Sequence, residues 1–344
     1  MKKADATSPL LSPSLANTQT PGTAFSGTQI ARTTVASASG KAILVGEHAV
    51  VYGARAVAMP VRNLQMSVRL TPTQHYAKSG EPLFRVTLGG RSVSEHLRGV
   101  LGDAFRALEI EPFPLDLDGH STVLIGAGLG SSASLCIVVL KALAEAVNLK
   151  LAPRQLAALG NNLERRFHGN PSGLDTAVVA MGQVIAFVKG EAPEPVSIEK
   201  PRTHAGGHPP WRFVLLDSGA RSSTLAMIQA AAPYFTGVGG DGRLARFDEA
   251  ALDVVYGLGT GDESHVADAM NRTGAWLTEA GIVNAEIAEL IDSARTLGCL
   301  AAKPTGAGGG GCVIALLDSE KAEEQLRGLR CRLGAGRVYA VELP

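Results

Sequence analysis

Three glycine-rich segments hold most of the residues in this sequence that could bind a charged ligand. They run from Gly40 to His48, from Gly126 to Ala133 and from Lys303 to Gly311. After the second segment, apolar residues recur at i, i+3, i+4 and i+7, which predicts an amphipathic helix at about 132–147. Glycines before a helix let the backbone approach a ligand, and the helix N-terminus offers N–H groups and a positive dipole end. The second segment therefore predicts a phosphate-binding loop.

This loop differs from two common nucleotide-binding fingerprints. It does not end in Gly-Lys-Ser/Thr as a Walker A loop does, and Gly126, Gly128 and Gly130 do not have the spacing of a dinucleotide loop. Ser131 and Ser132 stand where an N-cap or a metal-binding hydroxyl would be placed. From these residues alone, a tight turn with a serine cap remains the alternative.

The composition is that of a globular protein whose partners are small molecules. The chain has 344 residues, which suggests about two domains, and 45% of them are hydrophobic. The formal net charge is zero and no basic run carries interleaved aromatic residues, so nothing predicts a nucleic-acid partner. No apolar run reaches the roughly 18 residues that span a bilayer, and the N-terminus lacks a signal-peptide pattern. We expect a cytoplasmic protein with no membrane partner.

The four cysteines are spread along the chain in apolar contexts. They are Cys136, Cys299, Cys312 and Cys331, and no C-x-x-C pair occurs. This pattern favours buried free thiols in a reducing compartment and argues against a zinc site.

Strands and helices are expected to alternate irregularly in both halves of the chain, which predicts an α+β fold. Patterning predicts strands within 29–57 and at 66–70, 84–88, 183–188, 211–216, 312–317 and 337–342. Helices are expected at about 93–107, 132–147, 154–167, 173–181 and 321–332, with three or four more between 222 and 296. Pro153 is expected at the first position of the third helix. The stretch from Gly190 to Pro210, crowded with Pro, Gly, Glu and His, is the candidate domain boundary.

The first 30 residues form a segment of different composition. They are rich in Ser, Thr, Pro and Gly and show no hydrophobic period, so we expect a disordered tail. A targeting peptide is the alternative, against which Asp5 and the scarcity of arginine argue.

The three glycine-rich segments, in this order and spacing, resemble the signature motifs of the GHMP kinase superfamily. Two longer stretches are most similar to its mevalonate kinase family: Gly46-Glu-His-Ala-Val-Val-Tyr-Gly53 and His168-Gly-Asn-Pro-Ser-Gly-Leu-Asp175. The resemblance runs from about Thr33 to the C-terminus. It implies a domain at 31–208 like the second domain of ribosomal protein S5, a ferredoxin-like domain at 209–344, and an active site between them. It also implies transfer of phosphate from ATP, with Mg²⁺, to the primary hydroxyl of mevalonate, and makes a homodimer plausible.

The resemblance assigns roles to individual residues. Asp175 is implied as the base or hydroxyl-orienting group, with Lys41 as the cation beside it, and the metal ligands are implied to be Ser132 and Glu164. The residues implied to bind ATP are Gly126, Gly128, Leu129, Gly130, Ser131, Ser132 and Ala133. The residues implied to bind substrate are Glu47, His48, Ser223, Gly308 and Gly309.

For several of these positions, the residues leave alternatives open. Glu164 could be an exposed helix carboxylate paired with Arg165 or Arg166. Asp175 could cap its helix, Lys41 could be a solvated surface lysine, and His48 could be a structural histidine at a turn. Ser131 could exchange roles with Ser132, and Ser222 and Thr224 leave the register of Ser223 open. The third glycine segment could pack against a ligand or the phosphate loop, or be a plain hairpin turn. Ser39-Gly40 stands where the family commonly has Pro-Gly.

Two other functions remain as alternatives to mevalonate phosphorylation. Phosphomevalonate kinase, or another small-alcohol kinase of the superfamily, is the nearest, and a phosphorylated acceptor would call for an additional cluster of Lys or Arg in the pocket. A catalytically inactive ligand-sensing paralogue is the second. The presence of Lys41, Ser132, Glu164 and Asp175 argues against it.

Overall fold

The computed structural model describes residues 31–93, 95–203 and 206–343. The described residues from Ala31 to Leu343 belong to one compact unit. The predicted disordered tail at 1–30 lies outside the described residues.

The first sheet carries the N-terminal part of the chain. Its strands are β1 (Thr34–Val45), β2 (Ala56–Pro72), β3 (Phe84–Leu88), β4 (Arg91–Ser92), β5 (Leu115–Ser121), β6 (Ile185–Phe187) and β7 (Glu194–Pro195). The order is β4-β3-β5-β2-β6-β7, and β1 pairs with β2 outside this path. The long antiparallel β1–β2 pair has an irregular register between Ser39 and Gly40, immediately before Lys41. Such an irregularity bends a strand and redirects the next side chain.

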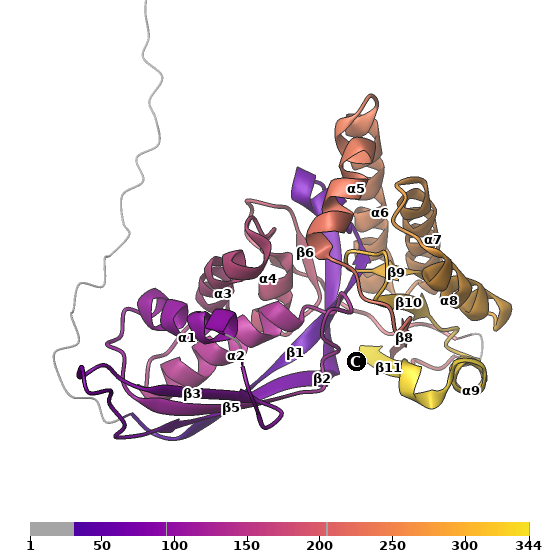
Figure 1. Cartoon of the computed structure of the whole chain (residues 1–344). Coiled ribbons are helices and arrows are strands. Elements are labelled where there is room, and N and C mark those ends of the chain that lie inside the picture. Colours follow the sequence, from indigo (N-terminus) through magenta and orange to yellow (C-terminus); the bar gives the residue numbers. More distant parts are fainter. Residues whose placement is uncertain (1–30, 94, 204–205, 344) are drawn as a thin grey trace, which may run out of the picture. The chain divides into compact units, whose positions relative to one another are not determined.

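Four helices cover this sheet (Figure 1). They are α1 (Glu95–Ala107), α2 (Ser131–Ala146), α3 (Pro153–His168) and α4 (Leu174–Met181). Helix α2 is apolar around most of its circumference because it packs on β1 and β2 and is itself covered by α1, α3 and α4. Its N-terminus is therefore held in place beside β1.

The second sheet belongs to the C-terminal part. Its antiparallel strands β8 (Trp211–Asp217), β9 (Ala301–Thr305), β10 (Cys312–Leu316) and β11 (Val338–Leu343) have the order β11-β8-β10-β9. The helices are α5 (Thr224–Thr236), α6 (Gly240–Thr260), α7 (Glu263–Glu279), α8 (Ala285–Thr296) and α9 (Ala322–Leu333). One apolar core joins residues of β1 and β2, such as Leu44 and Met59, to Phe213 of β8 and to α6 and α7. The two sheets therefore meet through a shared core.

These elements confirm the predicted α+β fold class. The predicted helices recur within about two residues of their expected ends, and Pro153 stands at the start of α3 as expected. Four helices occupy the described residues between 222 and 296. Strand β5 was not predicted, and β2 is much longer than the predicted 66–70. The division into domains at 208 and 209 stays a prediction.

The cysteines differ from expectation at one position. All four are free, and Cys136, Cys299 and Cys312 are buried, but Cys331 is exposed. Helix α9 buries Leu329 against the second sheet, and a residue two positions later lies about 200° around the helix. The apolar neighbours of Cys331 in sequence therefore do not cover it.

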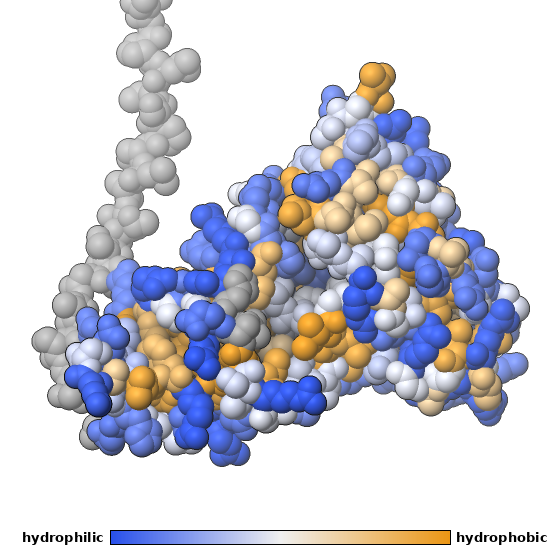
Figure 2. Space-filling model, in the orientation of Figure 1, coloured by the Kyte–Doolittle hydropathy of each residue, from blue (hydrophilic) through white to orange (hydrophobic). Residues whose placement is uncertain are grey.

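None of the helices in the described ranges is long and apolar enough to cross a membrane. The face shown in Figure 2 mixes hydrophilic and hydrophobic residues and is hollowed between the α3–α4 region and α5.

Candidate active site

A cavity of about 570 Å³ lies in this hollow. Its wall is built by β1, the N-termini of α2, α4 and α5, the C-terminal part of α3, and the loop between β9 and β10. The predicted site residues that line it are Lys41, Glu47, His48, Gly126, Gly128, Gly130, Ser131, Ser132, Glu164, Asp175 and Gly308. Residues far apart in sequence therefore meet around one space.

Lys41 and Asp175 form an ion pair at the edge of this space. Lys41 Nζ lies 3.1 Å from Asp175 Oδ2, and the lysine side chain is 3% exposed. Lys41 Nζ also donates to the carbonyl of Gly128 at 3.0 Å. The N-cap of α4 is Gly173, so Asp175 does not cap its helix. Both alternatives, a solvated lysine and a capping aspartate, are wrong.

Two glycines allow Lys41 and the predicted phosphate-binding loop at 126–133 to approach each other. Gly130 has φ 70°, and a Cβ there would lie 2.9 Å from Lys41 Cγ. Gly128 has φ 80°, and a Cβ there would lie 2.6 Å from the carbonyl oxygen of Thr305. The backbone N–H of Lys41 also donates to Leu129 O at 3.0 Å. Any side chain at either glycine would push the loop away from β1 or β9.

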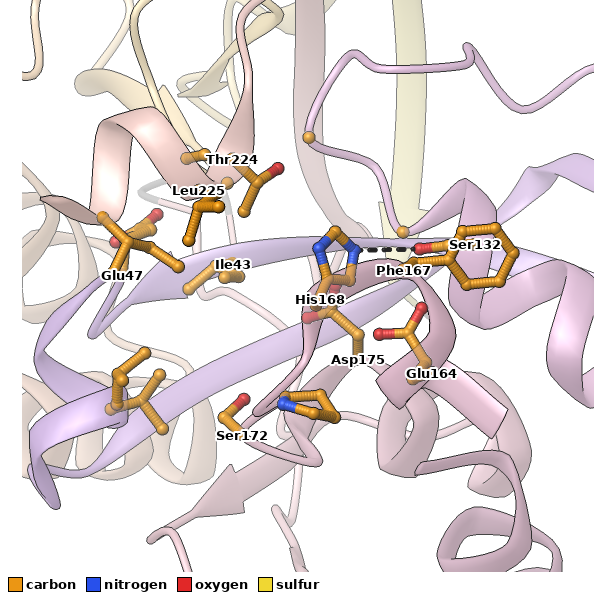
Figure 3. Close-up of a pocket in the computed structure, with 18 of the residues that line it drawn as sticks. Ile43, Glu47, Ser132, Glu164, Phe167, His168, Ser172, Asp175, Thr224 and Leu225 are labelled. Atoms are coloured by element: carbon orange, nitrogen blue, oxygen red, sulfur yellow. Dashed lines mark hydrogen bonds between the residues drawn. The ribbon is translucent and has the colours of Figure 1, made fainter. Parts of the chain in front are cut away.

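Glu164 points from α3 into the cavity and is buried (Figure 3). Arg166, one of its proposed surface partners, instead pairs with Asp103, so the exposed-carboxylate alternative is wrong. Burial raises the pKa of Glu164 to about 7, and the charge of Asp175 adds to the rise, while a hydrogen bond with Ser132 and the charge of Lys41 oppose it. Its Oε1 atom has no hydrogen-bond partner in the described structure.

Ser132 stands opposite Glu164 in the first turn of α2. The N-cap of this helix is Gly130, so Ser132 is not the cap. Its Oγ lies 3.3 Å from His168 Nε2, the contact drawn in Figure 3. A hydroxyl beside a buried carboxylate with an unused oxygen matches the hard oxygen ligands that Mg²⁺ prefers. These two residues fit a magnesium ion.

Glu47 and His48 line another part of the wall, where β1 ends. His48 Nε2 lies 2.8 Å from the carbonyl of Ala307, and since a carbonyl only accepts, Nε2 carries the hydrogen. Burial lowers the pKa of His48, and the hydrogen bond to Ala307 opposes this, which favours the neutral ring. His48 Nδ1 is then an acceptor, and it has no partner in the described structure.

Sequence reasoning missed the partner of Glu47. Lys303 on β9 forms a buried ion pair with it. Burial raises the pKa of Glu47 and lowers that of Lys303, and their mutual attraction opposes both shifts. The signal was present, because Lys303 follows the apolar run Cys299–Ala302 on a strand, and a charge there needs a buried partner. His168 and Asn161, to which the sequence assigns no role, also line the cavity.

The third glycine segment combines two of the readings left open. It connects the antiparallel strands β9 and β10, so it is a hairpin loop. It also packs against the phosphate loop, because a Cβ at Gly306 would lie 2.6 Å from Gly128 Cα, and one at Gly311 would lie 2.7 Å from Ala127 O. The segment therefore packs against the predicted phosphate-binding loop, and its residues Gly306, Ala307, Gly308 and Gly310 also line the cavity.

Four predicted site residues do not line the cavity. Leu129 and Ala133 are buried. The N–H of Gly309 donates to Ile282 O at 2.8 Å. Ser223 is exposed and caps α5, its Oγ accepting from Ala226 N at 3.4 Å.

The cap explains the displacement of Ser223, because the first turn of α5 needs an acceptor for its free N–H groups. Its neighbours Ser222 and Thr224 line the cavity instead. Ser222 Oγ donates to Gly308 O at 2.6 Å. Ser223 therefore lies outside the cavity wall, and its role in binding substrate stays a prediction.

Two models of one protein family match this chain. The family model for the GHMP kinases N terminal domain matches residues 95–183, and the model for the GHMP kinases C terminal domain matches residues 254–335. The chain belongs to the GHMP kinase family. This GHMP kinase is 27% identical over 310 residues to the mevalonate kinase of Pyrococcus furiosus, covering 84% of this chain and 90% of that one.

Solved structures of other members share the fold of this GHMP kinase. The L. major mevalonate kinase in complex with R-mevalonate has a TM-score of 0.76 at 20% identity, covering 91% of this chain and 97% of that one. The Streptococcus pneumoniae phosphomevalonate kinase in complex with phosphomevalonate and AMPPNP has a TM-score of 0.72 at 18% identity, covering 90% of this chain and all of that one. The fold therefore does not distinguish the two acceptors, and the cavity must.

Proposed function

We propose that this GHMP kinase is an ATP-dependent mevalonate kinase, which transfers a phosphoryl group to the primary hydroxyl of mevalonate in isoprenoid biosynthesis. The products are 5-phosphomevalonate and ADP. The observation that carries the proposal is the Lys41–Asp175 pair, which faces the phosphate loop in a cavity also lined by Glu47 and His48. The similarity to mevalonate kinases along about 84% of the chain supports it.

Phosphoryl transfer here needs an oriented hydroxyl and compensation for the charge on the transferred group. Asp175 accepts a hydrogen bond from the acceptor hydroxyl, and Lys41 Nζ, 3.1 Å away, forms an ion pair with this carboxylate. The new bond forms between the acceptor oxygen and the γ-phosphorus as the bond to the ADP oxygen breaks, and the hydroxyl proton passes to Asp175. A carboxylate is a weak base, so the proton moves late in a loose transition state. Lys41 offsets negative charge on the phosphoryl group.

Ser132 and Glu164 are the proposed ligands of Mg²⁺. The ion, when bound, neutralises charge on the triphosphate and helps to orient it. The partnerless Oε1 of Glu164 supports this assignment, because a buried carboxylate oxygen without a hydrogen bond is costly in free energy. Helix α2 orients Ser132, and N–H groups at the N-terminus of this helix can face the triphosphate.

The charge of the cavity favours an acceptor without a phosphate. Among the described residues, Lys41 is the one Lys or Arg that lines it, and Asp175 and the Gly128 carbonyl already engage its ammonium group. A phosphorylated acceptor would add a charge of about −2, which proteins bind with several cations. The cavity thus supports mevalonate over phosphomevalonate. The assembled Lys41, Asp175, Ser132 and Glu164 likewise support an active enzyme over an inactive paralogue.

The proposal extends to the setting of the enzyme. We propose a cytoplasmic enzyme, supported by its four free cysteines. Its partners are then mevalonate and ATP, without nucleic acid or membrane. A homodimer is proposed by analogy with the family alone.

A coupled assay of ADP release tests the function. ATP and Mg²⁺ are supplied with mevalonate, phosphomevalonate, galactose or homoserine, for the wild type and for Asp175→Asn. We expect turnover with mevalonate and its loss in the variant. Faster turnover of another alcohol would move the enzyme elsewhere in the superfamily. Tight binding of ATP and mevalonate without turnover would support the inactive paralogue.

A further inference from the structure

Lys303 and Glu47 form a buried ion pair beside the cavity. Their side chains are 0% and 1% exposed. Lys303 lies on β9 of the second sheet, whereas Glu47 follows β1 of the first, so the pair bridges the two sheets. A buried ion pair usually stabilises a fold no better than apolar residues of the same volume. Stability alone therefore gives a weak reason for this pair.

The ammonium group of Lys303 has no donor to spare for a ligand. Its Nζ donates to Glu47 Oε1, to Pro304 O at 2.8 Å and to Ile43 O at 3.4 Å. A lysine has three N–H donors, so all of them are used within the protein. Lys303 is also absent from the cavity wall. Any effect on the acceptor must pass through Glu47.

Glu47, in contrast, has one oxygen left over. It lines the cavity, and its Oε2 has no hydrogen-bond partner in the described structure and is closed off from bulk water. A hydrogen bond from a ligand hydroxyl to a buried, unpartnered carboxylate oxygen contributes more binding free energy than one to an exposed oxygen, because no water competes for the acceptor. The adjacent His48 Nδ1 is a second unused acceptor of the same wall. This wall is thus suited to donors, such as alcohol hydroxyls.

We propose that Lys303 is a positioning residue for the acceptor, which holds Glu47 by one oxygen so that the other accepts a hydrogen bond from the second hydroxyl of the acceptor. In mevalonate this is the tertiary hydroxyl, which is not phosphorylated. The inference rests on the proposed function. It assigns Lys303 a role in KM for the acceptor, separate from the Lys41–Asp175 pair.

Three variants test the role of the pair: Lys303→Met, Glu47→Gln and the double variant. Each removes charge at nearly constant volume. We expect each single variant to raise KM for mevalonate about tenfold to a hundredfold, the effect of losing one hydrogen bond to a charged group, with KM for ATP nearly unchanged. The KM of the double variant for mevalonate should be no higher than the larger of the two single-variant values, because both changes break the same contact.

Thr305→Val is the matched control. Thr305 Oγ1 accepts from Ile43 N at 2.8 Å and donates to Ile43 O at 3.2 Å, so it joins the same two strands without touching Glu47. We expect this variant to lower the melting temperature while leaving KM for mevalonate near that of the wild type. If it raises KM as much as Lys303→Met does at an equal loss of stability, Lys303 is merely structural and the proposal fails.

The experiment remains decisive if Lys303→Met does not fold. The double variant leaves no buried charge unpaired. If its KM for mevalonate equals that of the wild type, the proposal fails. The proposal also fails if the increases in KM for mevalonate that the two single variants show multiply in the double variant. Failure of the proposed function is distinguishable, because the wild type itself would then not turn over mevalonate.

Discussion

Lys41 Nζ and Asp175 Oδ2 lie 3.1 Å apart, although one residue comes from β1 and the other from the first turn of α4. The lysine is buried and the aspartate is about one-third exposed, and both line the cavity, so the acidic member of the pair is the more accessible one. This places the carboxylate toward a ligand and the cation behind it.

Replacing the carboxylate should abolish turnover without abolishing binding. We expect Asp175→Asn to lower kcat by about 10²- to 10⁴-fold, the usual contribution of a positioned base, with a small change in KM for ATP. Steady-state kinetics measure both quantities. Asp116→Asn is the matched control, since Asp116 pairs with Arg85 at an exposed site on β5 and β3 and should leave kcat unchanged. Equal losses in the two variants would contradict the role of Asp175.

The buried carboxylate of Glu164 should make stability depend on pH. Its pKa is raised from 4.5 to about 7 by burial, so the folded state holds a proton that the unfolded state has lost. The stabilisation is complete below the unfolded pKa of 4.5 and is lost as pH rises through 7. This window corresponds to a change on the order of 3 kcal/mol in the free energy of unfolding.

Urea unfolding of the wild type and Glu164→Gln at several pH values measures that change. His48 and His168, whose pKa values are lowered chiefly by burial, act in the opposite direction: their stabilisation is lost as pH falls through the usual histidine range. The difference between the two proteins therefore isolates Glu164. We expect the variant to gain relative stability from pH 5 to pH 8, and a constant difference would refute the assignment.

The glycines of the phosphate loop should not tolerate alanine. Gly128→Ala places a Cβ 2.6 Å from a backbone oxygen at a positive φ, so we expect a loss of about 1–3 kcal/mol and a higher KM for ATP. Gly242→Ala, in α6, meets no atom within 4 Å and should be neutral or stabilising. Thermal melting and ATP kinetics of both variants provide the check. Similar behaviour of the two alanines would mean that the loop can move away from β9.

Substitutions of the two serines before α5 should have different effects, one on stability and the other on KM for mevalonate. Ser223→Ala removes an N-cap and should cost about 0.5–2 kcal/mol of stability, with KM for mevalonate unchanged. Ser222→Ala removes the hydrogen bond to Gly308 O in the cavity wall and should raise KM for mevalonate several-fold with little loss of stability. Urea titration and kinetics distinguish them. A reversed pattern would restore the register predicted from sequence.

The helices could be predicted because their signals are local. Apolar spacing, Pro153 and the glycines at the ends of α4 mark boundaries without reference to other parts of the chain. Strand β5 escaped prediction because Asp116 and Asp118 are poor strand formers. Hydrogen bonds from Arg85 and Thr87 on the neighbouring β3 compensate for them.

By itself, the sequence determined the family motifs, the α+β class and the residue types available for chemistry, since all of these are written in local spacing and composition. Tertiary structure alone decided which of those residues meet. Lys303 joined Glu47, Ser222 replaced Ser223 in the cavity wall, and Cys331 was left exposed. Each outcome depends on which face of an element is buried and what lies opposite. Distance through space and access to water set the strength of hydrogen bonds and charges, and neither is encoded by spacing along the chain.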